Sequence, residues 1–154
     1  MKTKIFQLLL FLLLSSCGYE AVHSKKRAIN YNILIKEISF SGDRDINLKI
    51  KEKLKNYMSN EKSENFILKI YTTSDKTISS KNISGDATSY KNTVTVNVEA
   101  LMGNKLENNF TVQESFKYNN ASNKFDLKRY EKKIKINLSE TITDNIVFKL
   151  STMK

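Results

Sequence analysis

The chain contains few of the residues that cross-link, kink or catalyse. It has no proline, no tryptophan, four glycines, one histidine and one cysteine in 154 residues. A single cysteine excludes a disulfide within the chain, so packing must stabilise the fold. The histidine, His23, lies in a polar segment, and we interpret it as a solvated residue and not as a base or metal ligand. No Gly-rich phosphate loop, Gly-x-Ser-x-Gly sequence or nucleotide motif is present. These absences leave few candidates for catalysis.

Hydrophobic residues are concentrated near the N-terminus, in a run that is too short to cross a bilayer. After two lysines, the segment Ile5 to Leu14 is almost entirely apolar. Roughly ten apolar residues cannot span a hydrocarbon core that needs about 20. A basic start, an apolar centre and the small residues Ser15-Ser16 are typical of a secretory signal. We therefore predict that residues 1–16 are a signal peptide.

The only cysteine lies directly after this signal. Leu14-Ser15-Ser16-Cys17 has the form of a lipobox, so we expect Cys17 to be the first mature residue. It would carry thioether-linked diacylglycerol and an acylated amine, with palmitate among the chains, and several acyl chains on one residue give stable anchoring. Gly18 follows, not the Asp of inner-membrane retention, which favours the outer membrane of a Gram-negative cell, on its periplasmic side. The alternative is an ordinary signal followed by a free thiol.

The chain is strongly basic. Its formal net charge is +10. Without residues 1–16, which hold two lysines, 24 basic and 16 acidic residues remain, a net charge of +8. Such an excess often indicates nucleic-acid binding, but an exported, membrane-anchored protein meets no chromosome. We therefore expect phosphorylated lipid or an acidic protein surface as the partner, and no nucleic acid. A coding bias toward lysine is the alternative explanation.

The first half of the chain predicts a polar tether, a strand and a helix. Residues 17–30 are polar and form the lipidated N-terminal tether. Asn32 to Phe40 is rich in Ile, Leu and Phe and ends at a glycine, as a strand does. Asp43 or Asp45 then offers an N-cap for a helix to about Met58. Its apolar residues recur at helical spacing: Ile46, Ile50, Leu54 and Tyr57.

Three further strands are predicted from alternating residues. Phe66 to Tyr71 forms the second strand. The sequence leaves open whether the polar stretch Thr72 to Ser84 continues this strand. Val94 to Ala100 alternates valines with polar residues. Gly103-Asn104 then predicts a hairpin turn into a strand whose apolar face carries Phe110, Val112, Phe116 and Tyr118.

A long amphipathic helix closes the chain. Asn119 to Asn123 is a predicted loop, and Asp126 is the predicted cap. The apolar face then continues for about six turns, through Leu127, Tyr130, Ile134, Leu138, Ile142, Ile146 and Leu150. The order β-α-β-β-β-α predicts an α+β fold for residues 31–154, a single two-layer sandwich of a four-stranded sheet with two helices packed on one face. The other sheet face would carry Lys, Thr, Ser, Asn and Tyr.

Three stretches of the chain together match the pattern of a known family. The mature chain would begin with Cys17-Gly18-Tyr19, a Cys-Gly-aromatic start. The stronger match runs from Gly85-Asp86-Ala87-Thr88-Ser89-Tyr90 through Val94 to Val98 and on into Phe110 to Phe116. The closing helix, which ends with Ile142 to Leu150, completes a match in element order along the mature chain. In these features the chain resembles the LPS-assembly lipoprotein family LptE.

The resemblance implies a role in lipopolysaccharide transport without catalysis or cofactor. LptE proteins are outer-membrane lipoproteins that sit as a plug inside the LptD β-barrel, support its assembly, bind lipopolysaccharide and help insert it into the outer leaflet. Family members use basic residues at one end of the fold for the lipid's phosphates. The matching regions here are the loop before Tyr90 and the loop before the last helix, which makes Lys81, Lys91 and Lys124 the candidates.

Two other functions stay open at this point. The first is a structural or adaptor lipoprotein of another envelope complex that has the same sandwich but does not recognise lipid. The second is a periplasmic lipid-modifying enzyme. The sequence disfavours an enzyme, because no acid, base and nucleophile can be assembled from its residues, and no metal ligand set is evident.

Overall fold

The computed structural model describes residues 33–59, 65–103 and 105–153, which all belong to one compact unit. The predicted signal peptide (1–16), the lipid attachment site Cys17 and the tether (17–30) lie outside the described residues. Predictions for those segments are therefore not tested by the fold.

The first strand leads directly into the first helix through an aspartate cap. Strand β1 is Ile35–Gly42, helix α2 is Arg44–Leu54, and a 3-10 turn, η1, follows at Lys55–Tyr57. Asp43 is the cap, because its Oδ1 accepts hydrogen bonds from the backbone N–H groups of Asp45 (3.0 Å) and Ile46 (3.2 Å). This selects one of the two predicted caps and satisfies backbone donors that the helix leaves unpaired.

The sheet contains four strands in chain order. Strands β2 (Phe66–Lys81), β3 (Ala87–Met102) and β4 (Lys105–Asn119) follow β1. β1 pairs with β2 in parallel, and the other neighbours are antiparallel. The polar stretch after Tyr71 does extend β2, as far as Lys81. Gly103 lies in the turn between β3 and β4 with φ +56°, so the predicted hairpin is confirmed.

The last helix begins earlier than predicted. Helix α3 is Lys124–Ser151, and its cap is Asn123, so the prediction of Asp126 as cap is wrong. Asn123 Oδ1 accepts from the N–H groups of Phe125 (3.0 Å) and Asp126 (3.3 Å), while its amide donates to the Asp126 carboxylate (2.7 Å). Asp126 therefore lies in the first turn, where a negative charge is favourable near the helix N-terminus.

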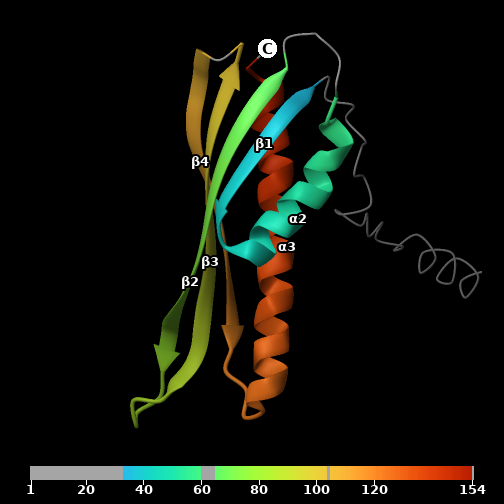
Figure 1. Ribbon diagram of the computed structural model, residues 1–154. Coiled ribbons are helices and arrows are strands. Elements are labelled where there is room, and N and C mark those ends of the chain that lie inside the picture. Colours follow the sequence, from blue (N-terminus) through green and yellow to red (C-terminus); the bar gives the residue numbers. More distant parts are fainter. Residues whose placement is uncertain (1–32, 60–64, 104, 154) are drawn as a thin grey trace, which may run out of the picture. The chain divides into compact units, whose positions relative to one another are not determined.

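Both helices pack on the same sheet face, so the predicted α+β two-layer sandwich is confirmed (Figure 1). The apolar alternation of β2 and β3 and the apolar stripes of α2 and α3 form one core. Its fully buried side chains include Phe66, Leu68, Val94, Val96, Ile46, Ile50, Ile142 and Ile146. Salt bridges from Lys49 to Glu140 (2.8 Å) and from Lys53 to Asp144 (2.6 Å) join the helices.

The two helices differ greatly in length, which leaves part of the sheet with only one helix over it. α2 has 11 residues and α3 has 28, or roughly 16 Å against 42 Å at 1.5 Å per residue. The ion pairs between the two helices extend from Asp45 with Lys132 to Lys53 with Asp144. The part of α3 before Lys132 therefore lies beside β3 and β4 and has no helical neighbour in the described part of the chain (Figure 1). Tyr130, on the predicted apolar stripe, is 46% exposed there.

Candidate functional site

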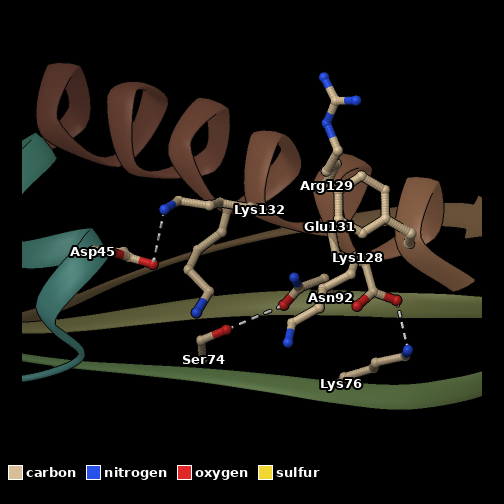
Figure 2. A pocket seen from close by; sticks show the side chains of 10 residues that line it. Asp45, Ser74, Lys76, Asn92, Lys128, Arg129, Glu131 and Lys132 are labelled. Carbon is tan, nitrogen blue, oxygen red and sulfur yellow. Dashed lines mark hydrogen bonds and ion pairs between the residues drawn. The ribbon is translucent and has the colours of Figure 1, made fainter.

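A groove of about 470 Å³ lies beside the N-terminus of α2, next to the part of the sheet that α2 leaves uncovered (Figure 2). The first half of α3 forms one wall, and the helix-facing side of β2 and β3 forms the floor. Five basic and two acidic side chains line it, together with a ring, a hydroxyl and an amide: Lys76, Lys128, Arg129, Lys132, Lys135, Asp45, Glu131, Phe125, Ser74 and Asn92. The lining therefore carries a net positive charge.

Helical spacing places the basic residues of α3 together. Lys128, Arg129, Lys132 and Lys135 recur at intervals of one, three and three residues, which places them on neighbouring positions of the helix surface. They lie in the first half of α3, far from the C-terminal turn where the helix dipole would stabilise cations. The excess of cations over carboxylates in the lining therefore favours an anion in the groove.

Some of the cations are held by internal partners that build the floor of the groove. Lys76 Nζ lies 2.5 Å from Glu131 Oε1 and 3.9 Å from the centroid of the Tyr90 ring. The Tyr118 hydroxyl donates to the same Glu131 oxygen at 2.8 Å. Burial, with the nearby Glu131 carboxylate, raises the pKa of Tyr118 well above its ordinary value, so this hydroxyl stays a donor.

Other cations pair with the start of α2. Lys135 Nζ donates to Asp43 Oδ2 at 2.8 Å, and Lys132 lies 3.9 Å from Asp45. Burial alone would raise the pKa of Asp43, but the hydrogen bond and charge of Lys135, with the N–H donors of Ile46 and Asp45, hold that pKa below its usual value. These contacts fix the N-terminus of α2 against α3.

Asp43 gives the first testable prediction. Since its pKa is lowered by folding, its contribution to stability is present above the unfolded pKa of about 3.9 and is lost as pH falls through the folded value. Asp43→Asn keeps a good cap but loses the ion pair, so its unfolding free energy should depend less on pH below about 4. Asp43→Ala should lose about 1 kcal/mol more, because the cap is removed too. Chemical denaturation at pH 3 to 7 measures both. Equal stabilities of the two variants would contradict the cap.

Two cations of the groove have no carboxylate partner among the described residues. Lys128 forms no ion pair within the residues that the structure describes, and neither does Arg129. Arg129 instead lies 5.8 Å from the ring centroid of Phe125, which is 69% exposed. Figure 2 shows Arg129 directed away from the sheet, at the rim. The rim therefore presents an unpaired guanidinium beside an exposed ring, which suits a ligand with both anionic and apolar parts.

The three lysines predicted from the sequence lie near one end of the fold, outside this groove. Lys81 ends β2 and pairs in register with Ala87, and Asn120 Nδ2 donates to Ala87 O at 2.8 Å. Lys124 Nζ in turn donates to Asn120 Oδ1 at 3.3 Å. Lys91 lies on β3 directly opposite Lys117 of β4. None of the three lines the groove.

The apolar stripe of the last helix, on which the prediction of that helix rests, gives no indication of the groove residues. The charge of the same segment does indicate them. Six of the twelve residues from 124 to 135 are basic, far more than in the rest of that helix. Lys76 and Asn92 gave no such signal, since strands separated in sequence bring them to the groove only through the register of β2 and β3.

Neither a metal site nor a membrane-spanning helix is found in the described part of the chain. No group of three or more His, Cys, Asp or Glu side chains there is arranged to hold a metal ion. No helix within residues 33–59, 65–103 and 105–153 is long and apolar enough to cross a bilayer.

Comparison with known proteins gives matches in structure but not in sequence. The sequence matches no protein-family model and no curated protein. Rare lipoprotein B from Shewanella oneidensis is 13% identical with a TM-score of 0.56, over 74% of this chain and 96% of that one. A minor lipoprotein from Acinetobacter baumannii is 15% identical with a TM-score of 0.58, over 78% and 93%.

A third similar structure is lipoprotein B from Nitrosomonas europaea, which is 12% identical with a TM-score of 0.54, over 80% of this chain and 86% of that one. These three proteins are described as lipoproteins, and none by an enzymatic activity. At such identities the likeness concerns the fold. The fold implied by the LptE resemblance is thus confirmed, and residues of this chain adopt the fold shared by these bacterial lipoproteins.

Proposed function

We propose that the protein is an outer-membrane lipoprotein, anchored through Cys17 on the periplasmic side, that binds lipopolysaccharide and partners an LptD-like β-barrel as plug and assembly factor. It acts by non-covalent binding, without turnover. The lipobox supports the anchor. The fold, which is that of known lipoproteins, supports membership in the same class of envelope proteins.

The groove is the observation that carries lipid binding. A phosphorylated lipid needs cations for its phosphates and an apolar surface for its chains. Lys128 and Arg129 offer two cations that no carboxylate of the described residues neutralises, and Phe125 beside them is exposed. Lys81 and Lys124 lie near one end of the same sheet and helix and would extend the basic surface that the phosphates meet. Lys91 lies on the opposite face of the sheet, because its neighbour Asn92 faces the groove.

The alternative is a structural or adaptor lipoprotein of another envelope complex. The joined helices and the polar outer sheet face would serve such a scaffold equally well. An adaptor without lipid recognition gives no reason for unpaired cations in a groove, so the groove favours the lipid-binding function. An enzymatic function is disfavoured because the hydroxyl in the groove, that of Ser74, donates to the Asn92 amide oxygen at 3.3 Å and not to a base.

Co-purification tests the barrel partnership. We expect the tagged full-length protein, extracted from membranes in mild detergent, to co-elute with one outer-membrane barrel in a near-stoichiometric amount. Mass spectrometry identifies the co-eluting protein. A Lys128→Glu/Arg129→Glu variant serves as control, since loss of lipid binding should leave the barrel bound. Recovery of a different envelope complex, or of no partner, would favour the adaptor.

A further inference from the structure

The sheet face away from the helices carries a second hollow, of about 700 Å³. Two adjacent rows of residues cross all four strands there in register. The first row is Ser39, Lys69, Glu99 and Asn109. The second row is Ser41, Tyr71, Asn97 and Thr111. We call these eight residues the outer-face rows. None of them has an aliphatic side chain.

The rows carry no net charge, although the mature chain is strongly basic. Lys69 is the only cation of the rows and lies 3.7 Å from Glu99, the only anion. The side chains of both are about half exposed, so the two charges compensate each other at the surface. A phosphate or another anion would gain little here, which distinguishes this face from the groove beside α3.

The uncharged groups of the rows suit a polar, hydroxylated ligand. Tyr71 is 49% exposed, so an apolar ring face is open to contact. Thr111 Oγ1 donates to Asn97 Oδ1 at 2.7 Å, which leaves the Asn97 amide N–H groups without a partner among the described residues. The hydroxyls of Ser39 and Ser41 donate to backbone carbonyls of β2, so the amides of Asn97 and Asn109 are the neutral groups left to meet a ligand. An open ring beside such amides is a combination that binds a sugar, whose ring faces are apolar and whose edge carries hydroxyls.

The spacing of the rows sets the length of such a ligand. Neighbouring strands lie about 4.8 Å apart, a distance comparable with one pyranose unit. Four strands therefore offer three intervals, roughly 14 Å, along each row. We propose that the outer-face rows bind an uncharged oligosaccharide of three pyranose units, with Tyr71 stacked on one ring and Asn97 donating to its hydroxyls. This site does not depend on the proposed lipid-binding groove.

Saturation-transfer NMR on the full-length protein tests the inference, in a detergent that has no sugar headgroup. Maltotriose and chitotriose are the probes, and they distinguish a plain hexose chain from an N-acetylhexosamine chain. We expect saturation transfer to at least one of them. Tyr71→Ala and, separately, Asn97→Ala should each weaken binding at least about tenfold. Tyr130→Ala is the matched control, because Tyr130 is also about half exposed but lies on α3. This variant should bind the trisaccharides as the unaltered protein does.

Three results would overturn the inference. The first is an absence of transfer to both trisaccharides, and the second is equal transfer in the Tyr71→Ala protein. The third is a protein occupant, detected when a photo-crosslinking residue at position 71 captures a barrel in cells and excess trisaccharide does not compete. The groove variants leave this face unaltered, so failure here and failure of lipid binding can be told apart.

Discussion

Replacement of Gly42 by alanine should destabilise the protein by at least about 4 kcal/mol, enough to unfold many small domains. Gly42 has φ +93°, and a Cβ at this position would lie 2.0 Å from Thr72 O and 2.9 Å from Thr72 C. Thr72 is buried, and its carbonyl also accepts the Asp43 N–H at 3.1 Å. Neither backbone can move away without breaking the junction of β1, β2 and α2. Denaturant unfolding followed by circular dichroism measures the loss.

Gly85→Ala is the matched control. Gly85 also has a positive φ, +88°, but nothing lies within 4 Å of an added Cβ. The Gly85→Ala variant should therefore lose only the free energy that a side chain costs at a positive φ, about 1–2 kcal/mol. The difference between the two variants isolates the steric conflict with Thr72. If both variants lost the same free energy, the close approach of β1 and β2 at Gly42 would be wrong.

The double variant Lys128→Glu/Arg129→Glu should bind lipopolysaccharide about 100-fold more weakly. Hydrogen bonds to charged groups contribute about 1.5–3 kcal/mol each, and two such contacts with phosphate would be lost and turned repulsive. Neither residue has a carboxylate partner among the described residues, so the exchange breaks no described ion pair. Calorimetric titration with purified lipopolysaccharide measures the affinity, and thermal unfolding checks that the fold is intact.

The control separates the groove from net charge. Lys36→Glu/Lys133→Glu changes the charge equally, at two exposed residues outside the groove, and should weaken binding far less. Chemically dephosphorylated lipopolysaccharide should bind the unaltered protein as weakly as the intact lipid binds the groove variant. Equal losses in both double variants would show a general electrostatic effect, which salt screens, and would reject the groove as the site.

The order and type of the elements could be predicted because their signals are local. Alternation in Phe66 to Tyr71 and in Val94 to Ala100 fixes which side chains face the core, and a register slip of one residue would expose them. The stripe from Leu127 to Leu150 does the same for the last helix. Asn123 was missed as its cap because Asp126 is an equally good capping residue, and only the hydrogen-bond geometry distinguishes them.

For the outer-face rows, the sequence could predict which types of residue the sheet face carries but not which of these residues are neighbours. The sequence indicated a polar sheet face, but it could not align Tyr71 with Asn97 and Thr111, because cross-strand neighbours depend on register across three separate pairings. Hydroxyl, amide and ring groups scattered over 73 positions of sequence became one surface only when the sheet formed.

The sequence by itself determined the lipobox, the excess of positive charge and the β-α-β-β-β-α order, since each depends on residue types and spacing within one segment. Only the tertiary structure decided which of the basic side chains are neutralised by carboxylates and which are available to bind an anion. α2 is shorter than α3, so β2, β3 and α3 border a groove in which Asp43, Asp45 and Glu131 neutralise some cations and leave Lys128 and Arg129 unpaired among the described residues. The ion pairs of the groove join segments that are distant in sequence, so no spacing along the chain encodes them.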